Sequence, residues 1–429
     1  MRIFIDGTES FWRPDNRTGI QRVARELCRR CVAMSPDGVE AVPVQFDGRR
    51  WRLCAGFDGA AYGLFALLRR LVAHGRAWRR LSRARWKACP AKVWLLLAMF
   101  AGLIGSAVAT AGAGLLRRVL PAPDAPPMRP GDVLLLPEYP LRRIASIESL
   151  RSRDVRVVAI IHDCVPLTHP QFYRQDREFA RYFDWCLANA HGIMTVSAFS
   201  EHEIRARLPA GGPWTAHFHL GADFSIPSSG RPPRRELAAA LGRTSFLMVG
   251  TIAPHKNHCQ ALDAMELRWR HGSGARLIIV GKVGWQADEL LGRIARHPEL
   301  GLRLFVFHDL DDGELAYAYS RSHALIAASY VEGFGLPVAE ALCRGLPVVA
   351  SDIPPVREVV EEGENDIPVF REIGGDSVDF FTLDDVDNLA RALGRLESLP
   401  RRQVDAVRFR DWNESTRQLL EEVRLRLAA

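Results

Sequence analysis

The 429-residue sequence predicts an α/β protein built from two parallel sheets, each covered by helices. Short apolar runs alternate with helical patterns over most of the chain, and this βαβ rhythm is typical of parallel sheets. The length also exceeds what one ordinary hydrophobic core holds together. Between residues 222 and 235, Pro, Ser, Gly and Arg replace the periodic apolar residues. We therefore expect two α/β domains, 1–221 and 236–405, joined by a linker at 222–235 and facing across a cleft.

Ten apolar runs have the length and composition of strands. They lie at 2–6, 39–46, 132–136, 155–161, 192–197, 246–250, 276–281, 303–307, 323–327 and 347–350. In parallel sheets, ligands bind beyond the carboxyl ends of the strands. The residues that follow these runs are therefore the first candidates for a functional site.

The net charge of +7 comes from one segment, residues 59–127. Between 59 and 123 there are eleven Lys and Arg and no Asp or Glu, so the remainder of the chain is net acidic. The first half of this insertion has the pattern of a basic amphipathic helix. The 24 residues from Val93 to Leu116 carry no charge and are long enough to cross a bilayer.

A single membrane crossing is disfavoured, because it would separate strands before residue 50 from strands after residue 131 that should share one sheet. We expect instead that residues 60–125 contact an anionic membrane surface, where each basic residue contributes about 1 kcal/mol. The chain would then be cytoplasmic and peripherally bound to the inner face of the cell membrane. An apolar hairpin packed on its own domain is the alternative. Nucleic-acid binding is disfavoured, because no aromatic stacking platform or basic groove motif accompanies the charge.

Eight cysteines are scattered along the chain, which opens directly on the strand-like MRIFID. We therefore expect no cleavable signal peptide and reduced thiols. Cys28 and Cys31 form a C-x-x-C pair, but they fall on a helical pattern and no second pair follows at zinc-ligand spacing. A metal or redox site at this pair is disfavoured.

The stretch SYVEGFGLPVAEALCRGLPVVASD, residues 329–352, has the pattern of a ligand site. A strand, a glycine-rich turn and a helix follow one another, with Pro337 at the first position of a helix over 337–344 and Gly345 just beyond its end. Free backbone N–H groups at such a helix start bind anions, here those of Phe334, Gly335 and Leu336.

A diphosphate would suit these amides, with Glu340 accepting hydrogen bonds from a ribose and Glu332 holding the group beyond the phosphates. For either glutamate alone, a solvated or helix-dipole role is the simpler interpretation. The two together at this spacing favour a ligand.

These residues resemble the E-x7-E signature of the family 4 retaining glycosyltransferases, which have the GT-B architecture of two Rossmann-like domains. The resemblance covers nearly all of the chain outside 59–127. Its other motifs are TGIQRVAREL at 18–27, IIHDCVPLTHP at 160–170, TVSAFSEHEI at 195–204, VGTIAPHKNH at 249–258 and DWNESTRQLL at 411–420. The resemblance also implies that a final helix within 406–429 returns to the first domain.

The family resemblance implies roles for matched residues. Lys256 would neutralise the donor diphosphate, although an exposed lysine after a turn is the alternative. Many relatives carry an arginine where this chain has His255 and a glutamate where it has Ala253, which leaves the help from His255 open. His162 would contact the transferred sugar, with a structural histidine as the alternative.

Three further residues take part by the same resemblance. Gly19 would let the chain approach the phosphates or the acceptor closely, although a plain helix-entry glycine is the alternative. His308 and Asp309 would lie near the nucleotide base.

The implied activity is transfer of a hexose, best guessed as mannose from GDP-mannose, to a lipid-linked or polysaccharide acceptor. The family is thought to use front-face attack with retention, and no D-x-D motif lies in a suitable place, so we expect no metal and no cofactor besides the donor. Another GT-B activity, such as a nucleotide-sugar epimerase, and a catalytically silent membrane-associated scaffold are the alternatives.

Overall fold

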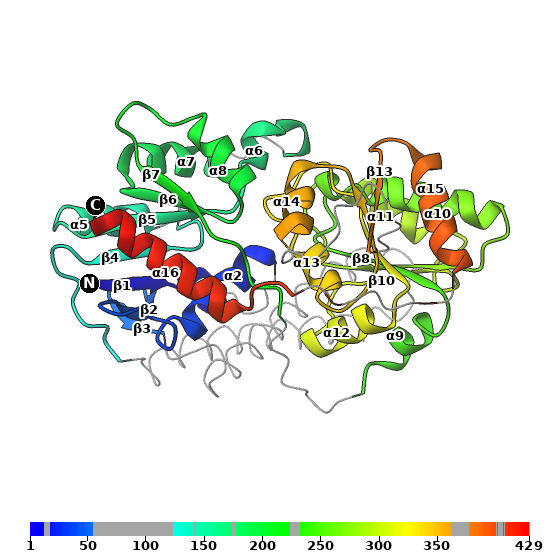
Figure 1. The fold of residues 1–429 in the computed structure, drawn as a ribbon, viewed down its shortest axis with the longest axis horizontal. Helices are drawn as coiled ribbons and strands as arrows, with labels where there is room; N and C mark the ends of the chain where they lie inside the picture. The colour runs from blue at the N-terminus through cyan, green and yellow to red at the C-terminus, as the bar shows by residue number, and fades with distance from the viewer. Residues whose placement is uncertain are drawn as a thin grey trace, which may run out of the picture. The chain divides into compact units, whose positions relative to one another are not determined.

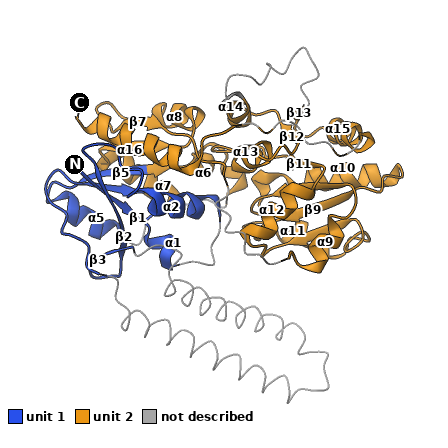
Figure 2. Cartoon of the chain, turned by 60° about the horizontal axis from the view of Figure 1, so that its bottom comes forward, with its two compact units in different colours: residues 1–159 blue, residues 160–429 orange. Residues whose placement is uncertain are grey.

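The computed structural model describes residues 1–12, 18–54, 123–140, 143–173, 177–223, 232–362, 377–399, 401, 406 and 408–428. Most of the predicted insertion, and with it the predicted membrane-binding segment, lies outside these ranges, as does most of the predicted linker. The chain divides into two compact units, residues 1–159 and 160–429 (Figure 2). Within the described ranges, no helix is both long enough and apolar enough to cross a bilayer.

The first sheet has seven strands in the order β3-β2-β1-β4-β5-β6-β7 (Figure 1). The strands are β1 Arg2–Asp6, β2 Glu40–Phe46, β3 Trp51–Leu53, β4 Val133–Leu136, β5 Arg156–Ile161, β6 Gly192–Thr195 and β7 Trp214–His217. Only β3 is antiparallel to its neighbour among the described pairings. The division between the two units falls inside β5, so this sheet takes strands from both.

The second sheet lies in residues 160–429 and has six strands in the order β10-β9-β8-β11-β12-β13. The strands are β8 Ser245–Val249, β9 Arg276–Val280, β10 Leu304–Phe307, β11 Ala324–Ala327, β12 Val348–Ser351 and β13 Val378–Phe381. All of its pairings are parallel. Its carboxyl ends therefore meet at one edge, where the candidate residues follow β8 and β11.

The described helices connect these strands. They are α1 Thr8–Trp12, α2 Gly19–Arg30, α5 Ile144–Arg151, α6 Val165–Thr168, α7 Arg177–Asn189, α8 Ala198–Arg205, α9 Arg235–Ala240, α10 His258–Arg270, α11 Asp288–Ala295, α12 Asp312–Arg321, α13 Leu336–Leu342, α14 Pro354–Glu362, α15 Val386–Ser398 and α16 Trp412–Ala428. Two short 3-10 helices, η3 Pro170–Phe172 and η4 Pro254–Lys256, precede α7 and α10.

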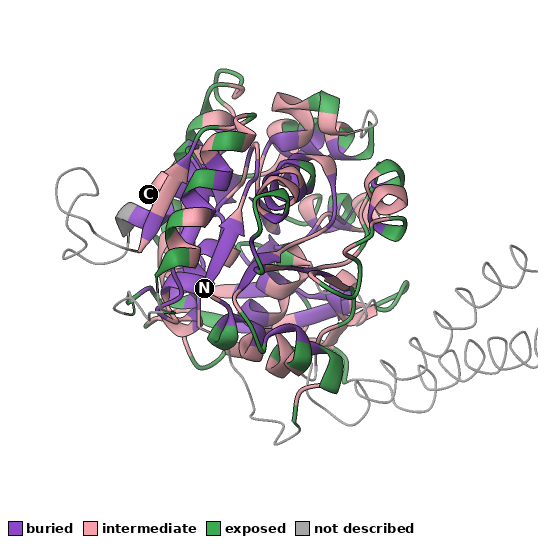
Figure 3. Cartoon of the chain, turned by 90° about the vertical axis from the view of Figure 1, so that its right-hand side faces the viewer, coloured by how far each residue is buried: buried purple, intermediate pink, exposed green. Residues whose placement is uncertain are grey.

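The central strands are buried on both faces, as continuous apolar runs predict. All four residues of β4 are buried, as are the last five of β5. Figure 3 shows this burial running through the strands, while the exposed residues lie mainly on helices and loops. In the second sheet, Phe246, Leu277 and Ile326 belong to a buried cluster that takes further members from α10 and α15. These cores hold the strand ends in fixed positions.

All ten predicted strands are present, with ends that differ by at most two residues, and the predicted class of two parallel α/β sheets is confirmed. Prediction missed β3, β7 and β13. Each of these strands lies at an edge of its sheet and has a neighbouring strand on one side only. Its sequence therefore mixes polar residues with apolar ones. The predicted cleft between the domains stays a prediction.

The last helix, α16, packs against the segment that follows β7. Ser415 Oγ donates a hydrogen bond to the His219 carbonyl at 2.7 Å. The Trp412 backbone N–H donates to Asp223 at 2.7 Å, and a Cβ atom on Gly221 would lie 2.5 Å from Trp412 N. Contact this close requires a glycine at position 221. The segment at 219–223 and the start of α16 are therefore fixed to each other.

Candidate active site

The turn between β11 and α13 has the local geometry that its glycines and proline predict. Gly335 caps α13 with φ +97°, a left-handed conformation that glycine adopts without a steric penalty. Pro337 is the second residue of the helix, and Gly345 has φ +63° just beyond its end. The predicted helix 337–344 is thus present as Leu336–Leu342, which begins one residue earlier and ends two residues earlier than predicted.

The start of α13 offers backbone N–H groups to a ligand. Within the described ranges, no carbonyl or side chain accepts a hydrogen bond from Phe334, Gly335 or Leu336 N–H. Unpaired N–H groups at a helix start are normally satisfied by water, a side chain or a ligand. The three amides predicted to cradle an anion are therefore available to one.

Lys256 and Glu332 form an ion pair at this turn. Lys256 Nζ donates to Glu332 Oε1 at 2.5 Å, and Ser329 Oγ donates to the same oxygen at 2.6 Å. Burial alone would raise the pKa of Glu332, but the Lys256 charge and these hydrogen bonds outweigh it and lower the pKa. Glu332 is therefore an ionised carboxylate held by an ammonium group, 76 residues distant in sequence.

One pocket brings Lys256 together with Gly335, one of the three residues predicted to bind an anion; Phe334 and Leu336 are not among the residues that line it. Lys256, Glu332 and Gly335 all line it, together with Ser329, Pro337 and Val338. The stem of Lys256 lies against Gly250, since a Cβ atom there would come within 3.7 Å of Lys256 Cε. The ammonium group of Lys256, at the end of η4, and Gly335, which caps α13, thus line one concave site within the second unit.

His162 approaches the same turn through its backbone. Its side chain is buried, and its carbonyl oxygen lies so close to Gly333 that an added Cβ atom would meet it at 2.2 Å. Ser200 Oγ donates to the His162 carbonyl at 3.4 Å and to the Gly333 carbonyl at 3.2 Å. Ser197 Oγ donates to the Gly333 carbonyl at 2.5 Å. The start of α8 therefore ties the segment after β5 to the 329–335 turn.

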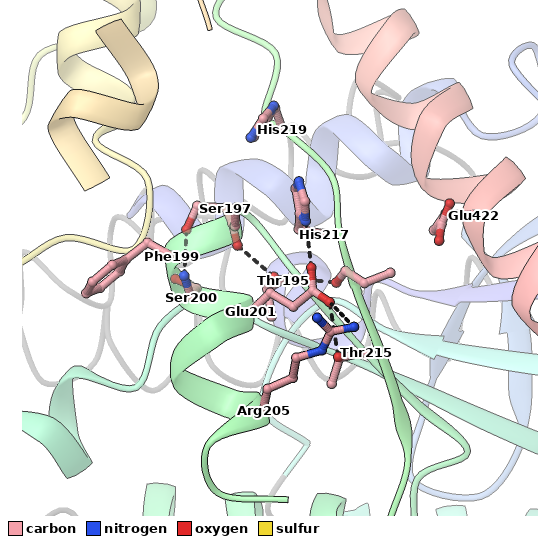
Figure 4. Close-up of polar contacts among 12 residues, drawn as sticks. Thr195, Ser197, Phe199, Ser200, Glu201, Arg205, Thr215, His217, His219 and Glu422 are labelled. Atoms are coloured by element: carbon pink, nitrogen blue, oxygen red, sulfur yellow. Dashed lines mark hydrogen bonds and ion pairs between the residues drawn. The ribbon is translucent and has the colours of Figure 1, made fainter. Parts of the chain in front are cut away.

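The start of α8 is itself held by acidic side chains that sequence reasoning missed. Glu358 of α14 accepts hydrogen bonds from Ala198 and Phe199 N–H at 2.6 and 2.9 Å. Figure 4 shows Glu201, one turn into α8, between Thr215 and His217 of β7. The hydrogen-bond distances from Glu201 to these side chains are 3.1 and 2.6 Å. Glu201 lies inside the matched segment 195–204, but its partners Thr215 and His217 are on another element, and Glu358 lies in none of the matched motifs.

Asp163 is a further ionisable group at the site, also missed from the sequence. Its Oδ1 accepts a hydrogen bond from Val165 N–H at 3.0 Å. Burial raises the pKa of Asp163 to about 6; Glu332 adds to this rise and Lys256 opposes it. The signal in the sequence was its place directly after His162, at the carboxyl end of a buried strand.

His255 is buried and uncharged at neutral pH. Burial and then the neighbouring Lys256 lower the pKa of His255 to about 4. At the position where the family resemblance implies an arginine, this chain therefore has a neutral ring. The positive charge of the pocket then rests on Lys256.

Three other predicted residues have protein partners. Glu340 is 2% exposed and accepts a hydrogen bond from Tyr319 Oη at 2.7 Å. Asp309 pairs with Arg234 at 2.8 Å, and His308 Nδ1 donates to the Gly281 carbonyl at 2.8 Å. Their roles toward a ribose or a base stay predictions.

Gly19 is the first residue of α2 in the first unit, and a Cβ atom there would meet no other atom within 4 Å. Packing therefore does not explain this glycine, and its role toward a ligand stays a prediction. At the nearby α1, Ser10 donates two hydrogen bonds to Glu138, from its N–H at 2.9 Å and from its hydroxyl at 2.8 Å. Burial raises the pKa of Glu138 to about 7.

The two cysteines of the C-x-x-C pair are buried at the end of α2, and burial raises the pKa of Cys31 to about 12. A thiol with so high a pKa is a poor nucleophile. Across the described ranges, no group of three or more His, Cys, Asp or Glu side chains is arranged to hold a metal ion.

Residues 232–372 match the family described as "Glycosyl transferases group 1". The match includes Lys256 and both glutamates of the E-x7-E motif. The match spans β8 to β12 and all residues that line the pocket, and the predicted family resemblance is confirmed for these residues.

Mannosyltransferases are among the relatives of this chain. It is 37% identical over 233 residues to the serotype-specific mannosyltransferase WbdA of Escherichia coli, a match covering 51% of this chain and 29% of WbdA. It is 33% identical over 225 residues to O-antigen chain mannosyltransferase B of Escherichia coli, covering 49% of this chain and 57% of that protein. The chain thus spans less than a third of the length of WbdA.

Two solved structures share the fold along almost their whole length. The structure of Anabaena Alr3699/HepE in complex with UDP-glucose matches with a TM-score of 0.53 and 16% identity, covering 100% of this chain and 98% of that one. Sucrose-phosphate synthase from Thermosynechococcus elongatus matches with a TM-score of 0.53 and 14% identity, covering 100% and 96%. Both are GT-B glycosyltransferases, and the predicted GT-B fold class is confirmed.

Proposed function

We propose that this chain is a retaining glycosyltransferase that moves mannose from GDP-mannose to a lipid-linked saccharide of a surface polysaccharide. The observation that carries the proposal is the shared pocket of Lys256, Glu332 and the start of α13. The relatives that act as mannosyltransferases support the choice of mannose.

The pocket suits a diphosphate leaving group. An ammonium group has three N–H donors, so Lys256 retains its bond to Glu332 while it donates to phosphate oxygens. Charge-assisted contacts of this kind contribute about 1.5–3 kcal/mol each. The amides of Phe334, Gly335 and Leu336 add fixed donors that need no reorganisation as negative charge develops.

In the proposed front-face reaction, the bond from the anomeric carbon to the diphosphate oxygen breaks and the acceptor oxygen bonds to that carbon from the same side. The acceptor's proton passes to the leaving phosphate oxygen. Glu332 and His162 would orient the sugar, and Glu340 the ribose. The reaction needs no general base from the protein and, we propose, no metal.

The test uses the full chain with GDP-mannose, UDP-glucose, UDP-N-acetylglucosamine or dTDP-rhamnose. Each donor is supplied with and without a synthetic lipid-linked α-mannoside. We expect release of GDP from GDP-mannose that depends on the acceptor, an α-linked product by NMR, and the same rate in EDTA.

Each other result contradicts a defined part of the proposal. A β-linked product excludes retention, and loss of rate in EDTA excludes metal independence. Interconversion of the donor without acceptor indicates an epimerase. No turnover of any donor would favour a silent scaffold.

We further propose that residues 60–125 hold the chain on an anionic membrane surface, near a lipid-linked acceptor. The support is the eleven basic residues that flank the uncharged segment 93–116, nine before it and two after it. The full chain is expected to co-sediment with phosphatidylserine-containing vesicles, and a variant lacking 60–125 is expected to stay in the supernatant. Equal sedimentation of the two proteins contradicts this part of the proposal.

A further inference from the structure

Three aromatic rings of the second unit, those of Tyr173, His255 and Trp285, lie together beside the candidate active site. The ring centroids of Tyr173 and Trp285 are 4.7 Å apart, those of His255 and Trp285 5.4 Å, and those of Tyr173 and His255 5.8 Å. The His255 plane is inclined by 14° to that of Trp285 and by 21° to that of Tyr173. The Tyr173 and Trp285 planes are inclined by 34°. Centroid distances this short are typical of rings that pack face against face. The rings therefore cover one another in part, and Trp285 is the one that is exposed.

The exposed member of this group is fixed in place. The Trp285 side chain is 37% exposed, yet its Nε1–H donates a hydrogen bond to the Phe172 carbonyl at 2.7 Å. Indole rings that are partly exposed and rigidly held are typical of binding surfaces, because little conformational entropy is lost when a ligand covers them. Folding alone does not require an exposed tryptophan here.

The rings adjoin the proposed diphosphate pocket without lining it. The His255 carbonyl accepts a hydrogen bond from Tyr330 N–H at 2.8 Å, two residues before Glu332. None of the three rings is among the residues that line the pocket of Lys256 and Gly335. A ligand on the rings would therefore lie next to the reacting sugar of the donor and outside the pocket that binds the donor's phosphates.

The chemistry of His255 fits a ligand with hydroxyl groups. Its Nδ1 is enclosed and has no hydrogen-bond partner among the described residues. An enclosed N–H without an acceptor costs more than an enclosed lone pair, so the proton of the neutral ring belongs on Nε2. The side chain then carries one uncharged N–H donor, Nε2–H, next to the Trp285 ring.

A pyranose ring matches this surface, because it has an apolar C–H face and hydroxyl groups around its edge. Burying the C–H face against the rings is favourable by about 25 cal/mol per Å² of apolar surface. We propose that the exposed ring of Trp285, backed by Tyr173 and His255, forms a platform on which a hexopyranose unit of the acceptor saccharide stacks. This inference rests on the proposed function, since the acceptor must meet the donor beside Glu332.

The test measures binding of α-mannotriose to the full chain without donor, by saturation-transfer NMR and calorimetry. For Trp285→Ala we expect the Kd to rise at least ten-fold, which is about 1.4 kcal/mol. Trp285→Phe keeps an aromatic ring but loses the Nε1–H bond to Phe172, so its Kd should stay within about three-fold of the wild type. Leu302→Ala, at a side chain that is 64% exposed, is the control and should change nothing.

Three results would overturn the platform. They are an absence of α-mannotriose binding to the wild type at millimolar concentration, equal losses in Trp285→Phe and Trp285→Ala, and a Trp285→Ala variant that weakens GDP binding in place of saccharide binding. The last result would assign the rings to the nucleotide base. Trp285-dependent saccharide binding by a chain that transfers no sugar would refute the proposed function and leave the platform standing.

Discussion

Lys256→Met is expected to lower turnover by about 10²–10³-fold, because Lys256 is the only cationic side chain among the described residues that line the pocket of the leaving diphosphate. The same change leaves the Glu332 carboxylate without its ammonium partner in a site where both side chains are about 85% buried. Removing one partner of a buried ion pair lowers the free energy of unfolding by about 3 kcal/mol. The free energy of unfolding should therefore fall together with turnover, as measured by urea denaturation and by GDP release.

A double variant separates these two effects. Lys256→Met with Glu332→Gln removes both charges, so stability should recover to within about 1 kcal/mol of the wild type while turnover stays lost. Arg303→Met, which breaks the more exposed pair with Glu299, is the matched control. It should change stability by less than about 1 kcal/mol and leave turnover unchanged. Wild-type turnover in the double variant would exclude Lys256 and Glu332 from the reaction.

The sequence predicts those parts of the fold and site whose signals are local. The central strands are continuous apolar runs, and the turn before α13 shows its glycines and proline directly. The edge strand β13, Val378–Phe381, gives no such signal, because its sequence VDFF mixes polar and apolar residues. Local pattern therefore finds the central strands and the edge strand β10, and misses the other three edge strands, β3, β7 and β13.

Contacts between distant residues could not be read from the sequence. Lys256 and Glu332 were predicted to serve one ligand, but their direct ion pair depends on how β8 and β11 lie side by side in the sheet. Glu340 was predicted to face a ribose, and the structure adds the hydroxyl of Tyr319, 21 residues before it. The roles of Glu358 and Trp285 depend likewise on partners in other elements, which no local spacing reveals.

Gly333→Ala is expected to disrupt the candidate site more than any other glycine substitution in the turn. The new Cβ atom would lie 2.2 Å from the His162 carbonyl oxygen and 3.1 Å from Asp163 Cβ. The first neighbour is backbone, held by Ser200, and cannot move aside cheaply. Overpacking of this kind costs at the upper end of about 1–3 kcal/mol, and a displacement near 1 Å in an active site lowers rates by about 10². Thermal unfolding and GDP release would measure the two losses.

Alanine substitutions at two other glycines, Gly335 and Gly274, separate the effect of a steric clash from that of backbone strain. At Gly335 an added Cβ atom meets only ordinary contacts, the nearest at 3.9 Å from Val356, so Gly335→Ala should cost only the left-handed strain of about 1–2 kcal/mol. Gly274→Ala, where nothing lies within 4 Å, should be neutral. If Gly333→Ala were as stable and as active as Gly274→Ala, the 329–335 turn would not pack on the His162 backbone. His162 would then lose its link to Glu332, because Gly333 is the residue through which the turn contacts the segment after β5.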